Sequence, residues 1–161
     1  PRQAHGAMTA KRTGGSRLAT IVLPTWLRWT IYASTAVLFI TGVMWLVAHF
    51  GMRDASDDLP HPAEHWILRV HGFAMLVGLF VYGSLLRVHM INAWNMRRNR
   101  MTGGIVSSVL LILTLTGYVL YYGTETTRPV MSALHWVIGL AIGGLLPFHI
   151  WRGRKSRKAP D

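Results

Sequence analysis

The sequence predicts an all-α membrane protein, a bundle of four transmembrane helices that run alternately up and down. The chain has 161 residues, of which 51% are hydrophobic and only 14% are charged, whereas a soluble domain carries about 25% charged residues. Most of the charges lie outside four long apolar segments, in the tails and joints, and each segment reaches the ~20 residues that a spanning helix needs. The joints between the segments are short, which favours antiparallel neighbours.

Taken in order, the chain divides into a tail, a bundle and a second tail. Residues 1–24 are polar, basic and rich in small side chains, which is typical of a cytoplasmic tail and unlike a signal peptide. The bundle is predicted over residues 25–152, and residues 153–161 form a basic cytoplasmic tail. The four helices are predicted at about residues 26–50, 64–90, 102–122 and 129–151.

The distribution of positive charge predicts the orientation. Lysine and arginine concentrate in the two tails and in the joint after the second helix, whereas the other two joints carry Asp54, Asp57, Asp58 and Glu125. By the positive-inside rule, both termini are cytoplasmic, as in a multi-pass integral membrane protein. The net charge of +11 belongs to these cytoplasmic faces, so we expect no nucleic-acid partner. Membrane lipid is the expected surrounding of the bundle.

The sequence contains no cysteine. This excludes disulfide bonds, iron–sulfur ligation and thiolate zinc sites within the chain. It also excludes covalent attachment of a c-type haem, which needs a Cys-x-x-Cys-His motif.

Two pairs of histidines lie on the second and fourth helices. His71 and His89 are eighteen residues apart, which is five helical turns, so they share one face roughly 27 Å apart along the axis. His135 and His149 are fourteen residues apart, an offset of about 40° and a rise of about 21 Å. The two helices run parallel in an up-down bundle. His71 and His135 are then expected near the outer face, and His89 and His149 near the inner face.

This arrangement favours two bis-histidine sites, each holding a b-type haem. Neutral imidazole is a good ligand for iron, and ionisable side chains at membrane depth are usually functional. Gly78 and Gly139 lie between the paired histidines and offer gaps for a flat porphyrin, although glycines also serve helix–helix contact. A kink at Pro147 would absorb the difference between the two spacings.

Other interpretations of the histidines stay open. The histidines could instead form structural hydrogen bonds between helices, a proton relay, or the binding site of a transported metal. A relay usually includes membrane-embedded carboxylates, and zinc is bound by ligands that lie closer together. His49 is an alternative to His71 as the partner of His135. His61 and His65 lie near the outer joint, where they suit a partner contact, a proton exit or a quinone pocket.

The pattern resembles the bacterial membrane-bound dihaem cytochrome b superfamily, such as the cytochrome b subunits of formate dehydrogenases and nickel–iron hydrogenases. The resemblance covers residues 26–151, and His135 and His149 match the two-ligand helix of that family. Several members place a ligand near the start of the first helix, where this chain has Trp26, Arg28 and Trp29. Both remaining candidates lie instead on the second helix. The resemblance implies two haems b and exchange of electrons with quinone.

The predicted function is a membrane subunit that carries electrons between the quinone pool and an extracytoplasmic redox partner, such as a c-type cytochrome or a dehydrogenase. Four ligands for two irons leave no open position for catalysis at the metal. Docking is expected at Asp54–Asp58 and at the joint from Thr124 to Arg128. The alternatives are a standalone quinone-linked oxidoreductase acting on superoxide or ferric iron, and a haem-free structural subunit.

Overall fold

The computed structural model describes residues 23–52, 61–95 and 99–158. Every regular element in these ranges is a helix, and four helices are long and apolar enough to cross a membrane. This confirms the all-helical class and the four membrane-length helices. The four are α1 (Thr25–Gly51), α2 (Pro62–Leu85), α4 (Arg100–Tyr122) and α5 (Arg128–Lys158).

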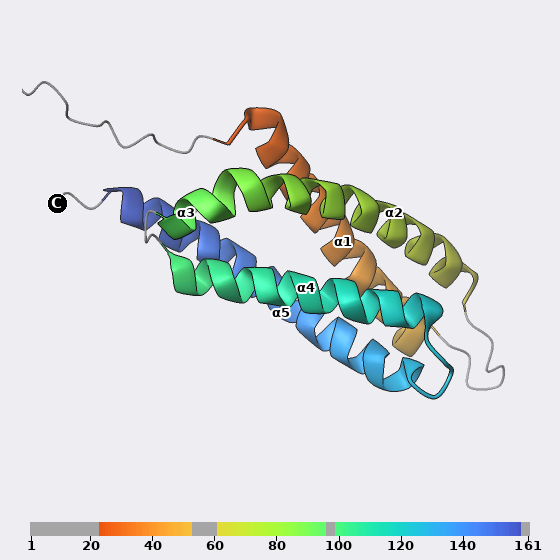
Figure 1. The fold of residues 1–161 in the computed structure, drawn as a ribbon. Helices are drawn as coiled ribbons and strands as arrows, with labels where there is room; N and C mark the ends of the chain where they lie inside the picture. The colour runs from red at the N-terminus through yellow and green to blue at the C-terminus, as the bar shows by residue number, and fades with distance from the viewer. Residues whose placement is uncertain (1–22, 53–60, 96–98, 159–161) are drawn as a thin grey trace, which may run out of the picture.

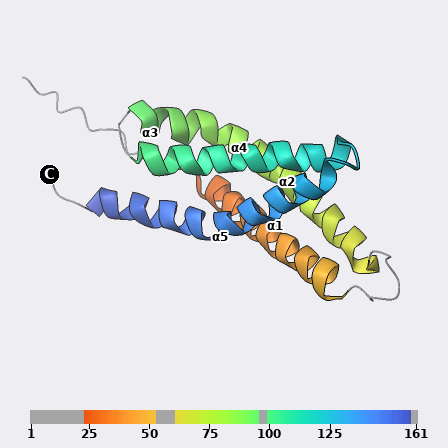
Figure 2. The ribbon, with the colours of Figure 1, turned by 90° about the horizontal axis from the view of Figure 1, so that it is seen from below.

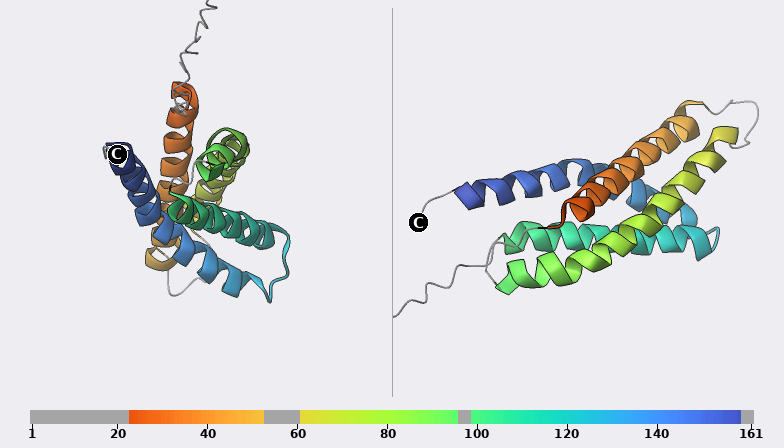
Figure 3. Two further views of the ribbon diagram at one scale, coloured as in Figure 1. Left: turned by 60° about the vertical axis from the view of Figure 1, so that its left-hand side comes forward. Right: turned by 90° about the horizontal axis from the view of Figure 1, so that it is seen from above.

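The helices form two antiparallel pairs (Figure 1). Helix α1 packs along α2, and we call this pair the first hairpin; α4 packs along α5, and we call this pair the second hairpin. A smaller contact between α1 and α5 joins the hairpins. The two views in Figure 3 show the hairpins side by side, with each helix antiparallel to its partner.

A buried carboxylate fixes the start of α2 and ties it to α1. His61 caps α2, Pro62 occupies the first turn, and Glu64 completes a capping box by accepting a hydrogen bond from the backbone N–H of His61 at 3.3 Å. Such a box satisfies backbone donors that a helix start leaves without partners. The second oxygen of Glu64 lies 3.2 Å from Nδ1 of His49 at the end of α1. One side chain therefore holds both helices of the first hairpin together.

The second predicted helix does not end at residue 90. Helix α2 passes into a wide π-helical turn, Leu86–Met90, in which the backbone N–H of Ile91 bonds the carbonyl of Leu86, and then into α3 (Ile91–Asn95). Such turns are rare in proteins, and many of those known occur at functional sites. This one contains His89. Asn99 then adopts a left-handed φ of 49°, which asparagine tolerates better than most residues, and α4 begins at the next residue.

Helix α5 continues beyond its predicted end. It runs without a break through Pro147 to Lys158, so residues 153–158, assigned to a basic tail, are helical. A proline inside a helix removes the hydrogen bond to the fourth preceding residue, which here is Gly143. The view in Figure 2 shows α5 changing direction part-way along its length, as expected from that lost bond.

Among the described residues, apolar and polar side chains are buried in nearly equal number. The buried apolar residues are Leu27, Ala48, Ala74, Val81, Val106 and Ile142, and the buried polar residues are Ser34, Thr41, Glu64, Thr102 and Thr116. Large apolar side chains such as Phe73, Phe80 and Leu115 lie on the outside, where a lipid-facing surface needs them. Polar groups at membrane depth need hydrogen-bond partners, and three of the buried threonines find them at histidines.

Candidate functional site

Two histidines from different hairpins face each other inside the bundle. His71 lies on α2 and His135 on α5, and their ring centroids are 6.2 Å apart with 69° between the ring planes. Both side chains are half-buried. The structure thus brings together the two residues expected to form the outer pair.

Each of these rings is held by a threonine from the other helix of its own hairpin. Nδ1 of His71 lies 2.8 Å from the hydroxyl of Thr41 on α1. Nδ1 of His135 lies 2.9 Å from the hydroxyl of Thr116 on α4. Because Nδ1 is engaged in both rings, Nε2 is the nitrogen that remains for a ligand.

A glycine follows each threonine and lets the ring lie against the helix backbone. A Cβ atom on Gly42 would meet Cε1 of His71 at 3.8 Å, and a Cβ on Gly117 would meet Cε1 of His135 at 3.4 Å. These distances leave room for little more than a methyl group, so a side chain larger than that of alanine would crowd the ring. We call the threonine and the glycine together a Thr-Gly cradle.

The same cradle occurs a third time. Nδ1 of His149 lies 3.1 Å from the hydroxyl of Thr102, and a Cβ on Gly103 would lie 3.6 Å from Cε1 of His149. Thr102 and Thr116 are fourteen residues apart on α4, as are His135 and His149 on α5. The antiparallel helices of the second hairpin therefore bring two cradles against two histidines in one register.

The fourth predicted ligand sits in a different local structure. His89 lies in the π-helical turn that follows α2, with its Nδ1 atom buried. The site that His89 was expected to share with His149 stays a prediction.

Within the described residues, no three histidine, aspartate or glutamate side chains cluster in a way that could hold a metal ion. Comparisons with protein-family models, with curated proteins and with solved structures found no match. What distinguishes the site is therefore its two-histidine geometry. A pair of imidazoles suits a metal whose remaining positions are filled by a cofactor, as in haem.

The two glycines singled out by the sequence lie in contacts within the hairpins. A Cβ on Gly78 of α2 would meet Leu38 of α1 at 3.6 Å, and a Cβ on Gly139 of α5 would meet Leu113 of α4 at 3.9 Å. These are ordinary van der Waals distances, so both positions lie in helix–helix contacts without requiring glycine. Their part in accommodating a porphyrin stays a prediction.

The histidines at the other end of the first hairpin have different surroundings. The ring of His49 stacks on Trp45 at 4.4 Å between centroids and bonds Glu64, so it is His71 that lies beside His135. His61 caps α2, and the exposed His65 lies edge-on to its neighbouring tryptophan. A partner, proton or quinone role for them stays a prediction.

Of the two predicted docking segments, one lies outside the described residues, namely Asp54–Asp58. The other is a short turn before α5, where the hydroxyl of Thr127 donates to the carbonyl of Thr124 at 2.9 Å. Its surface is exposed and includes Glu125.

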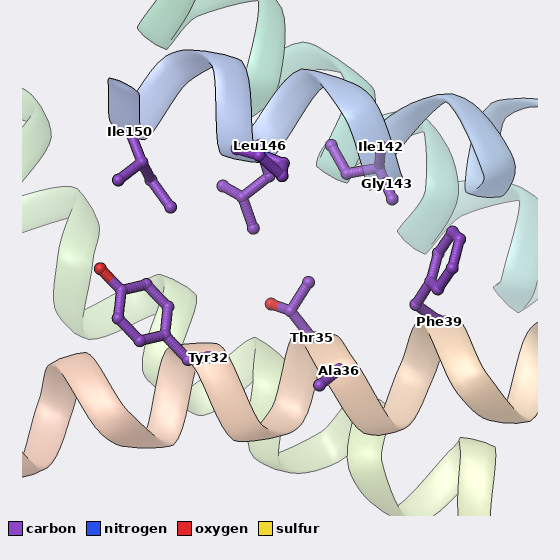
Figure 4. Close-up of a pocket in the computed structure, with 9 residues that line it drawn as sticks. Tyr32, Thr35, Ala36, Phe39, Ile142, Gly143, Leu146 and Ile150 are labelled. Carbon is purple, nitrogen blue, oxygen red and sulfur yellow. The ribbon is translucent and has the colours of Figure 1, made fainter. Parts of the chain in front are cut away.

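An open groove of about 270 Å³ runs between α1 and α5. Figure 4 shows Tyr32, Thr35 and Phe39 of α1 facing Gly143, Leu146 and Ile150 of α5 across it. The lining is apolar apart from the two hydroxyl groups of α1. The groove borders the contact between α1 and α5.

Sequence reasoning identified the histidines but missed the threonines that hold them. Threonine is common in membrane helices, where its hydroxyl usually bonds its own backbone, so a single threonine carries no signal. The signal was the Thr-Gly dipeptide, repeated at 41–42, 102–103 and 116–117. The last two copies are fourteen residues apart, as are His135 and His149.

Proposed function

We propose that the chain is a membrane cytochrome in which His71 and His135 hold a b-type haem between the two hairpins. The observation that carries this proposal is the pair of rings that face each other, 6.2 Å apart, with Nδ1 of each already bonded to a threonine. Hydrogen bonds between histidine and threonine hold neighbouring membrane helices together, but these two use only Nδ1 of each ring. Here each ring is satisfied within its own hairpin and still faces the other.

The separation of the rings suits ligation of one metal ion. Two imidazoles that both bind one metal ion through bonds of about 2 Å would have ring centres no more than about 6 Å apart. Only two protein ligands meet here, and a porphyrin would supply the other ligands of the iron. The glycines beside Thr41 and Thr116 let both rings lie close to the helix backbones. The residues present therefore fit a haem.

His149 and His89 are the proposed ligands of a second haem toward the cytoplasmic side. When bound, a b-type haem accepts and donates one electron at a time. The chain's own part is to bind and orient the two cofactors with the imidazoles of α2 and α5, and to exclude water with apolar helices. We propose that electrons pass between the quinone pool and an extracytoplasmic redox protein, in a bacterial inner membrane with both chain ends in the cytoplasm.

The groove between α1 and α5 supports the quinone part of the proposal. A lipid-soluble quinone needs an apolar path from the bilayer and a few polar groups to fix its head. The groove is lined by apolar side chains and carries the hydroxyl groups of Tyr32 and Thr35. It is formed in part by residues close to His149 in the sequence, Leu146 and Ile150.

Haem quantification on the purified full chain tests the proposal. We expect two haems b per chain in the wild type and loss of about one in either His71→Ala or His135→Ala. The control is His65→Ala, which removes an exposed histidine and is expected to keep both haems. A colourless wild-type protein would contradict the proposal and leave a structural membrane bundle. Equal haem content in all four proteins would show that the facing pair is not the site.

A further inference from the structure

The three cradle threonines carry a consequence for the protonation of the histidines. Each threonine hydroxyl has one proton and two acceptor positions. In Thr41 the oxygen lies 2.6 Å from the carbonyl oxygen of Val37, and in Thr116 it lies 2.9 Å from that of Ile112. A carbonyl can only accept, so each hydroxyl donates its proton to the carbonyl of its own helix.

The hydroxyl oxygen must then accept a hydrogen bond from the histidine. Nδ1 of His71 and Nδ1 of His135 approach these oxygens to 2.8 and 2.9 Å, and with the hydroxyl proton directed elsewhere, the proton in this contact belongs to Nδ1. This contact favours the tautomer with the proton on Nδ1 and the lone pair on Nε2.

The geometry points to Thr41 and Thr116 as positioning residues that hold the facing histidines in the tautomer required for iron ligation. Thr102 does the same for His149, because its hydroxyl contacts the carbonyl of Asn99 at 3.3 Å and Nδ1 of His149 at 3.1 Å. This inference rests on the proposed function for its purpose, but the tautomer itself is a property of the protein without cofactor.

The tautomer decides how His71 and His135 can interact with each other. Two neutral rings that both carry their proton on Nδ1 present two lone pairs, so neither Nε2 can donate a hydrogen bond to the other. The pair is therefore arranged to receive a positively charged or electron-accepting centre between the rings. A threonine that accepts from Nδ1–H also raises the basicity of the ligand, as outer partners of ligating histidines do. Stronger donation favours ferric over ferrous iron.

Nitrogen-15 NMR of the haem-free full chain in detergent tests the tautomer directly. We expect the Nδ1–H form for His71 and His135 in the wild type. Thr41→Val keeps the shape of the side chain and removes the hydroxyl, so the His71 ring is expected to shift to the Nε2–H form, and Thr41→Ser to restore the Nδ1–H form. Thr114→Val is the matched control, because Thr114 bonds only the carbonyl of Leu110 on the same helix.

The haem-loaded protein provides the second readout. Thr41→Val and Thr116→Val are each expected to weaken haem retention about 10–100-fold. Each is also expected to raise the midpoint potential of one haem by about 59 mV for every tenfold change in the ferric-to-ferrous preference. Serine variants are expected to retain the wild-type potential, and Thr114→Val to leave it unchanged. Because Thr41 and Thr116 lie on different hairpins, a folding defect in one variant does not affect the test with the other.

The outcomes separate this inference from the proposed function. The role of the threonines would be overturned if the rings were in the Nε2–H form in the wild type, or if the tautomer did not change when the hydroxyl was removed. This holds even if the protein binds two haems. Nδ1–H rings that respond to Thr41→Val in a protein that binds no haem would uphold the tautomer and overturn its assignment to iron. A potential that shifts equally in Thr41→Val and Thr114→Val would show a general packing effect and contradict the inference.

Discussion

Alanine at Gly143 perturbs the contact that joins the two hairpins, and therefore the placement of His71 against His135. A Cβ atom at this position would lie 2.5 Å from Cε2 of Phe39, 2.9 Å from Cζ and 3.2 Å from Cδ2. Carbon atoms pack at about 3.5–4.0 Å, so the aromatic ring has to retreat by roughly 1 Å. Figure 4 shows Phe39 of α1 beside Ile142 and Gly143 of α5.

The change in the free energy of unfolding in Gly143→Ala is the sum of two opposing contributions. Overpacking costs about 1–3 kcal/mol, and Phe39 is 37% exposed, so its ring has an open side and the cost falls in the lower half of that range. Alanine in place of a helical glycine stabilises by about 1 kcal/mol. Gly144 is the matched control, because a Cβ there meets no atom within 4 Å and only the stabilising term remains.

Thermal unfolding of the two variants in the same detergent measures the difference. We expect Gly143→Ala to be less stable than Gly144→Ala by about 1–2 kcal/mol, which for a chain of this size is roughly 2–8 °C in Tm. The haem content of Gly143→Ala is expected to fall below that of Gly144→Ala, because the hairpins that carry His71 and His135 no longer meet in the same register. Equal Tm values for the two variants would refute the packing of Phe39 on Gly143.

Three further predictions follow from the fold. Glu64→Ala is expected to lower the free energy of unfolding by about 1–2 kcal/mol, because it removes the helix cap and the link between α1 and α2. The control Glu125→Ala, at an exposed position, is expected to change this free energy by less than about 0.5 kcal/mol. Chemical denaturation measures both. Gly117→Val is expected to displace the ring of His135 and to lose about one haem per chain. The control Gly104→Val, at a position where a Cβ meets no atom within 4 Å, is expected to keep both haems. Equal haem content in the two variants in a pyridine haemochrome assay would contradict the Thr-Gly cradle. For orientation, a green fluorescent protein fused to the C-terminus is expected to fluoresce and an alkaline phosphatase at the same place to be inactive, and the reverse result would place the C-terminus outside.

The four membrane-length helices could be predicted from the sequence because their physical cause is local. A backbone in lipid has to satisfy its hydrogen bonds within the helix, so length and apolar composition decide the outcome without knowledge of packing. The start of α2 was predicted at about residue 64, two residues after its position at Pro62. Its end was not predicted, because the wide turn at Leu86–Met90 has no composition that distinguishes it from an α-helix.

The site could be predicted in part. The helical period and the antiparallel topology are enough to place His71 near His135, and the structure places them so. The threonines were missed because the period of one helix does not give the register between two helices, and only the matching spacings of the Thr-Gly dipeptides on α4 and the histidines on α5 carried that information. For Gly78 the sequence allowed a gap for a cofactor or a close helix contact, and only the packing shows it against Leu38 of α1.

The most direct test of the central claim is electron paramagnetic resonance of the oxidised full chain. If His71 and His135 bind one ferric iron through Nε2 from rings 69° apart, the protein gives a low-spin ferric signal with strongly anisotropic g values, as steeply crossed imidazole planes produce. That signal is lost in His71→Ala and in His135→Ala and persists in His65→Ala. A high-spin signal, the rhombic low-spin signal of parallel rings alone, or no ferric haem signal in the wild type would contradict ligation by the facing pair.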